Sequence, residues 1–240
     1  MYEPRTYRNW AKDDDLVSFE ASVRETDLYI RAKTNLKSKA EKSILKHREP
    51  LEKYIAKNPV FFNSLSPVNV EPGAPKIVKM MADAGRRANV GPMAAVAGAV
   101  AELVGRDLLE YSPEIIVENG GDIFLKIEKT RFIGVFAGTS PFTGKLRIEV
   151  VPEDTPAGIC TSSGTVGHSL SFGKADAAVI CARSAALADA AATAVCNEVK
   201  TAEDIEKAIE LGRKIKGLNG ILIIKGDKIG AWGNIKLHGV

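Results

Sequence analysis

The stretch that decides the fold runs from Glu114 to Ile127 and has the sequence EIIVENGGDIFLKI. Two apolar runs of strand length stand on either side of Asn119-Gly120-Gly121-Asp122. The two glycines tolerate positive φ angles, and Asn and Asp are common in tight turns. This stretch therefore predicts two β-strands joined by a turn in the middle of the chain.

Further segments share strand composition, namely 17–23, 28–32, 132–137, 145–151, 177–182, 221–225 and 229–232. The first two segments and the last two predict hairpins near the ends of the chain. The two that follow residue 127 suggest a meander with the central pair. The run at 177–182 is typical of a buried strand.

Helical periodicity or capping residues predict helices at 36–57, 75–88, 91–105, 184–199 and from residue 201 onward. Pro50 lies inside the first helix and is expected to kink or divide it, because proline cannot donate a backbone hydrogen bond. Residues 93–101 are almost entirely Ala, Gly and Val, so this backbone can approach another element closely.

Together, hairpins and helical connections predict one α/β domain over residues 1–240, with mixed, largely antiparallel sheets packed against helices. An all-parallel Rossmann sheet is disfavoured because no GxGxxG motif follows an early strand. A 240-residue chain with 45% hydrophobic residues is large enough to bury one such core.

The composition excludes several classes of protein. A net charge of +3 with dispersed basic residues is not that of a nucleic-acid binder. No apolar run approaches the roughly 20 residues that cross a bilayer, and residues 1–11 lack the pattern of a signal sequence. The three cysteines form no CxxC pair and suit a reducing compartment. We therefore expect a cytoplasmic protein without a membrane or nucleic-acid partner.

The first candidate ligand site is the Asn119-Gly120-Gly121-Asp122 turn. Its glycines would let a ligand approach the bare backbone, and Asn119 and Asp122 could bond to polar edges of that ligand. The same residues are ordinary hairpin-turn chemistry, and on the sequence alone this structural interpretation is favoured.

The second candidate is Thr161-Ser162-Ser163-Gly164, a predicted loop followed by His168. Hydroxyl groups and glycine N–H groups in one loop are suited to holding phosphate oxygens. His168 is a candidate general base, although a single histidine is more often structural or exposed. Ser162 and Ser163 are disfavoured as nucleophiles because the loop lacks a GxSxG motif.

The third candidate is the pair Asp189 and Thr193, four residues apart and therefore on one face of an Ala-rich helix. A carboxylate among alanines is costly to bury without a partner, and Mg²⁺ or Ca²⁺ would supply one. Asp189 could equally cap or hydrogen-bond a neighbouring loop. The residues themselves leave both alternatives open.

Taken in order, these segments resemble the ApbE superfamily between Gly91 and Asn197. The resemblance rests on Gly120-Gly121-Asp122 after a strand, the Thr161 loop with His168, the apolar strand at 177–182, and Asp189 with Thr193. The pattern is similar to that of a short, poorly characterised archaeal and bacterial branch.

This resemblance implies an ApbE-like fold, a divalent cation (Mg²⁺ or Ca²⁺) held by Asp189 and Thr193, and FAD as ligand or substrate. In the flavin transferases of this superfamily, FAD is cleaved and FMN moves to a threonine hydroxyl of an acceptor protein. His168 is similar in position to the family's proton-transfer histidine. The Asn119–Asp122 turn and the 161–164 loop would bind the dinucleotide.

Two departures from the family pattern leave other functions open. The transferases usually carry Lys-Gly where this chain has Gly91-Pro92-Met93-Ala94, and an aspartate after the histidine where it has residues 169–173 without an acid. The alternative is a non-catalytic flavin- or small-anion-binding accessory protein, which family context links to sulfur assimilation. A third interpretation is structural, with Ala-rich helices as an oligomer interface, and a homodimer is the base-rate expectation. The sequence leaves the reactivity of Cys160 open.

Overall fold

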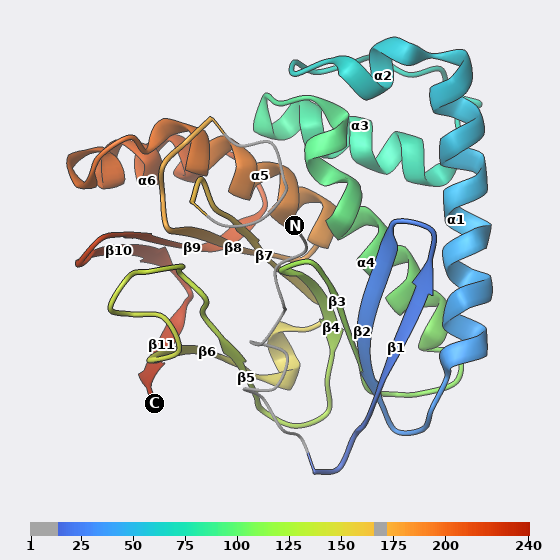
Figure 1. Cartoon of the computed structure of the whole chain (residues 1–240), viewed down its shortest axis with the longest axis horizontal. Helices are drawn as coiled ribbons and strands as arrows, with labels where there is room; N and C mark the ends of the chain where they lie inside the picture. The colour runs from blue at the N-terminus through green and yellow to red at the C-terminus, as the bar shows by residue number, and fades with distance from the viewer. Residues whose placement is uncertain (1–13, 166–171) are drawn as a thin grey trace.

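The computed structural model describes residues 14–165 and 172–240 (Figure 1). Within this part of the chain, eight strands form a large sheet in the order β1-β2-β3-β4-β7-β8-β9-β10. Their bounds are β1 Val17–Val23, β2 Thr26–Ala32, β3 Ile115–Asn119, β4 Asp122–Lys126, β7 Ala157–Ser162, β8 Ala177–Ala182, β9 Leu218–Lys225 and β10 Lys228–Gly233. All neighbouring strands in it pair antiparallel. The predicted largely antiparallel α/β fold is confirmed.

A second, three-stranded sheet has the order β11-β6-β5, with β5 at Arg131–Gly134, β6 at Leu146–Val150 and β11 at Lys236–Gly239. The predicted meander from 114 to 151 is therefore wrong, because its first two strands belong to the large sheet and its last two to the small one. A short 3-10 helix, η3 (Pro152–Asp154), leads from β6 back to the large sheet at β7.

Helices cover one face of the large sheet and the small sheet covers the other (Figure 1). The helices are α1 Lys37–Lys57, α2 Pro59–Asn63, α3 Lys76–Ala88, η2 Pro92–Ala95, α4 Val96–Leu108, α5 Ala185–Glu198, η4 Ala202–Asp204 and α6 Ile205–Arg213. No single described helix is long and apolar enough to cross a membrane, and α3 passes that test only together with η2 and α4, across a bend of 105°.

The strands of the large sheet divide their side chains between two cores. In β3, Ile115 and Val117 point into the core under the helices, while Ile116 lies in the core shared with the small sheet. The same alternation places Ile180 toward the helices and Val179 toward the small sheet. A strand buried on both faces is apolar throughout, which is why 177–182 lacks the polar alternation of β1.

Two sequence-based expectations about elements need correction. Helix α1 continues through Pro50, so this proline does not divide it. Strand β7 was not expected, because Ala157-Gly158-Ile159-Cys160-Thr161-Ser162 has few of the residues that mark strands. A glycine is required there, since a Cβ on Gly158 would lie 2.3 Å from the Cα of Ala185. Close contact between β7 and α5 therefore explains the small residues of both elements.

Gly158→Ala should destabilise the fold by about 1–3 kcal/mol, because the added methyl meets the backbone of α5 rather than a movable side chain. Chemical denaturation of the variant measures this cost. Gly73→Ala is the matched control, since a Cβ there meets nothing within 4 Å. Equal denaturation midpoints for the two variants would contradict the tight β7–α5 contact.

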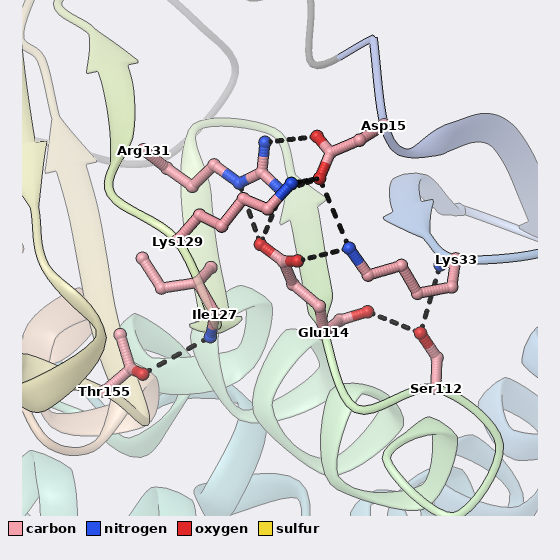
Figure 2. Close-up of polar contacts among 8 residues, drawn as sticks. All are labelled: Asp15, Lys33, Ser112, Glu114, Ile127, Lys129, Arg131 and Thr155. Carbon is pink, nitrogen blue, oxygen red and sulfur yellow. Dashed lines mark hydrogen bonds and ion pairs between the residues drawn. The ribbon is translucent and has the colours of Figure 1, made fainter.

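A buried ion-pair cluster joins the two sheets (Figure 2). Glu114, just before β3, is fully buried. Its Oε1 lies 2.6 Å from Arg131 Nη2 of β5, and its Oε2 lies 2.8 Å from Lys33 Nζ. Asp15 accepts two hydrogen bonds from the same guanidinium, at 2.7 and 3.1 Å. Lys129 Nζ, 66% exposed, pairs with Asp15 at 3.0 Å. The cluster thus ties the N-terminal hairpin and the small sheet to the start of β3.

Candidate functional site

The Asn119–Asp122 segment forms the tight turn between β3 and β4, as predicted. Gly120 and Gly121 have φ angles of 67° and 108°, which glycine adopts without strain. Gly121 N donates to Glu118 Oε1 at 3.1 Å, and Asn119 Nδ2 donates to the carbonyl of Ala97 at 3.1 Å. The turn is therefore fastened to the beginning of α4.

The segment 161–164 is only partly a loop. Thr161 and Ser162 are the last residues of β7, while Ser163 and Gly164 follow the strand. Cys160 pairs with Asp122 across β7 and β4, so Thr161 lies beside the glycine turn. A Cβ on Gly121 would lie 3.8 Å from the carbonyl oxygen of Thr161. Strand pairing thus brings the first two candidate segments together.

Beyond β7 the chain is tied back to the neighbouring elements. Gly164 N donates to the carbonyl of Ala175 at 3.0 Å, and Thr165 Oγ1 donates to Asp176 Oδ1 at 3.2 Å. Phe172 N donates to Asn197 Oδ1, in the last turn of α5, at 2.8 Å. His168 lies outside the described residues, so its role stays a prediction.

Asp189 and Thr193 lie one turn apart on α5, and both are partly exposed. Asp189 Oδ2 accepts a hydrogen bond of 2.9 Å from Gly98 N, in the first turn of α4. Glycine is needed at 98, since a Cβ there would lie 2.8 Å from the Cβ of Asp189 and 2.3 Å from the Ala185 carbonyl oxygen. Asp189 therefore does stabilise a neighbouring helix start, which is the structural alternative that the sequence left open.

Glu102 of α4 positions α5 and was missed from the sequence. It is 2% exposed, and its Oε2 accepts hydrogen bonds of 2.8 Å from Ser184 Oγ and from Ala185 N. A carboxylate at a helix N-terminus satisfies free N–H groups and interacts favourably with the helix dipole. The available signal was an acidic residue in the middle of an Ala- and Val-rich helix.

Asp122 is a buried acidic residue beside the glycine turn. It is 7% exposed, and its Oδ1 is buried without a hydrogen-bond partner among the described residues. Burial raises the pKa of Asp122 well above its usual value, and the nearby charge of Asp189 raises it further. Burial likewise raises the pKa of Asp189 to about 7, against the opposing effect of the Gly98 and Ala97 N–H groups.

These shifts predict a pH dependence of the metal-free protein. A carboxyl with a raised pKa favours its protonated form when folded, so its stabilising contribution is complete below the unfolded pKa near 4 and falls as the pH rises to about 7. The wild-type melting temperature, measured with a chelator present, should therefore fall more between pH 5 and pH 8 than that of Asp189→Asn. Parallel profiles would show that Asp189 does not titrate with a raised pKa.

Comparisons with known proteins agree with this architecture. A family model described as "AbpE bacteria" matches residues 8–231. The UPF0280 protein of Methanocaldococcus jannaschii is 47% identical over 219 residues, which cover 89% of each chain. The UPF0280 protein of Methanopyrus kandleri is 38% identical over 226 residues, or 91% of each chain.

Two solved structures share the fold at low sequence identity. The apo form of the flavinyl transferase ApbE of Pseudomonas stutzeri has a TM-score of 0.61 and 14% identity, over 90% of this chain and 94% of that one. The ApbE protein of Thermotoga maritima has a TM-score of 0.59 and 14% identity, over 90% and 96% of the two chains. Given the family match and the close relatives, this chain belongs to the AbpE bacteria family and has the ApbE-like fold.

Proposed function

We propose that this chain binds FAD or a related dinucleotide together with a divalent cation, where the Asn119–Asp122 turn, the end of β7 and α5 meet. The observation that carries the proposal is the convergence of a glycine turn, strand-end hydroxyl residues and an Asp-bearing helix face on one end of the sheet. The family match and the structural similarity to the flavinyl transferase of P. stutzeri support a flavin as the ligand.

The residues fit a divalent cation. Asp122 Oδ1 is a buried oxygen without a partner among the described residues, and Asp189 and Thr193 present further oxygens one helical turn apart. Mg²⁺ and Ca²⁺ prefer oxygen ligands and accept water at remaining positions. Asp189 and Thr193 would hold the cation, which when bound would neutralise part of the diphosphate charge.

The chain's own groups would bind and orient the dinucleotide. Gly120 and Gly121 have no side chains to block its approach, and the Thr161, Ser162 and Ser163 hydroxyls can donate to phosphate oxygens. In the proposed reaction, a threonine hydroxyl of an acceptor protein forms a bond to the FMN phosphorus as the bond to AMP breaks. His168 is the proposed base that takes the hydroxyl proton. With water in place of the hydroxyl, the products are FMN and AMP.

A non-catalytic flavin- or small-anion-binding accessory protein is the second candidate, with sulfur assimilation as a setting. The observation that favours it lies at Gly91, where the transferases of the superfamily usually carry Lys-Gly. A Cβ at Gly91 would lie 1.8 Å from the carbonyl oxygen of Ser64, so this chain packs its backbone tightly there. The segment 91–94 also contains no titratable side chain.

The two candidates are separated by incubating the full chain with FAD and Mg²⁺ and measuring released AMP and protein-bound flavin independently. AMP release with covalent flavin on an added acceptor supports the transferase, and AMP release without it supports hydrolysis. Saturable FAD binding without AMP release supports the accessory protein. Absence of FAD binding with and without Mg²⁺ would overturn the flavin proposal.

A further inference from the structure

Asp122 and Asp189 lie in the same region between the large sheet and the helices. Asp122 lies two residues before Phe124, and both Phe124 and Cys160 belong to the core under the helices. Since side chains alternate along a strand, Asp122 points to this same face, directly opposite Cys160 in the pairing of β4 and β7. Asp189 reaches the same region from α5, which packs on β7.

Neither carboxylate is neutralised by a basic side chain. Within residues 14–165 and 172–240, the ion pairs of Lys and Arg involve other acids and leave out both Asp122 and Asp189. Asp189 has the N–H of Gly98 as a donor, whereas Asp122 Oδ1 has none among the described residues. A buried carboxylate beside a second, half-buried one is costly when no cation balances their charges.

We propose that Asp122 is a second carboxylate ligand, beside Asp189, of the divalent cation, and that this pair binds the cation before any nucleotide arrives. The inference rests on the proposed function in its use of Asp189. A cation held by Asp189 alone would need a further oxygen ligand from a diphosphate. The unpartnered Asp122 oxygen provides that ligand within the chain. No group of three His, Cys, Asp or Glu side chains in metal-binding arrangement occurs in the described part of the chain, so hydroxyl, carbonyl or water oxygens complete the set.

The assignment gives Asp122 a role other than contact with the nucleotide. A carboxylate facing a diphosphate directly would repel it, whereas a carboxylate bound to a cation increases the affinity of the site for that cation. Asp122 and Asp189 therefore combine into one binding unit of charge −2, matched to a divalent ion. The cation, once held, leaves open positions for phosphate oxygens.

The test uses the full chain, freed of metal with a chelator, and Mn²⁺ alone as the probe. Free Mn²⁺ is followed by its electron paramagnetic resonance signal during titration without nucleotide. Wild type should bind one Mn²⁺ per chain, and Asp122→Asn and Asp189→Asn should each weaken binding by at least about tenfold. Asp227→Asn is the control, because this exposed turn residue contacts only Lys228 among the described ion pairs.

A second measurement guards against misfolding of the variants. At one Mn²⁺ concentration, Mn²⁺ should raise the melting temperature of wild type and of Asp227→Asn more than that of Asp122→Asn. Without metal, Asp122→Asn should melt no lower than wild type. Unchanged Mn²⁺ affinity in Asp122→Asn, or no Mn²⁺ binding by wild type without nucleotide, would overturn the inference. Normal two-carboxylate Mn²⁺ binding without any FAD binding would instead leave it standing and overturn the proposed function.

Discussion

Asp189→Asn is expected to weaken Mg²⁺-dependent FAD binding by roughly tenfold to hundredfold, the range seen when groups around metal sites are altered. The substitution removes the charge but keeps an oxygen that can still accept the hydrogen bond from Gly98 N. The start of α4 therefore keeps its partner, and the fold should remain intact. FAD titrations by flavin fluorescence, with Mg²⁺ and with a chelator, measure the effect.

The size of the Mg²⁺ effect is what distinguishes a ligand from a helix cap. If Asp189 holds the cation, Mg²⁺ increases the FAD affinity of wild type far more than that of the variant, while their FAD affinities in chelator become similar. Asp227→Asn should give the same FAD titration curves as wild type under both conditions, because Asp227 is an exposed residue of the β9–β10 turn. Identical wild-type and Asp189→Asn curves under both conditions would assign Asp189 to the structural role alone.

The local patterns of the sequence predicted individual helices and strands more reliably than they predicted which strands pair with one another. The alternation at 17–23 and the turn at Gly120-Gly121 are local signals, and β1 and the β3–β4 hairpin follow them. The small sheet was not predicted, because β6 pairs with β11 across more than 80 residues. Such long-range pairing depends on which apolar sheet faces must be buried against one another, and a local sequence pattern does not specify this.

In the candidate site, too, the sequence identified individual residues but not which of them lie close together. Asp189 and the glycine turn stand out as residue types in unusual surroundings, so the sequence sufficed to select them. Their proximity depends on the register of β4 against β7, which places Asp122 opposite Cys160. A shift of one residue would turn Asp122 to the other face of the sheet, and the sequence alone cannot exclude such a shift. Glu102 was missed because its partner, the start of α5, is 82 residues away.

Arg131→Met is expected to destabilise the protein by up to about 3–5 kcal/mol, the usual cost of breaking a buried ion pair, because Glu114 then keeps only the ion pair with Lys33 among the described residues. Arg131 donates to Glu114 Oε1 through Nε at 2.8 Å, and Glu114 is fully buried (Figure 2). Lys33 and Arg131 together hold the pKa of Glu114 below its usual value despite burial, so the carboxylate is charged in the fold. Urea denaturation at neutral pH measures the loss.

Two further variants serve as comparisons. One removes the exposed Lys129 instead of the buried Arg131, and the other removes the buried charge of Glu114 together with Arg131. Lys129→Met removes a cation that is 66% exposed and should change stability by no more than about 1 kcal/mol. Arg131→Met combined with Glu114→Leu should recover most of the loss, because the buried carboxylate is then gone.

Glu114 precedes β3 and the glycine turn follows it, so the cluster and the candidate site occupy opposite ends of one strand. Folded Arg131→Met should therefore keep wild-type affinity for Mn²⁺, and a loss of that affinity would show that the ion cluster is coupled to the site through β3.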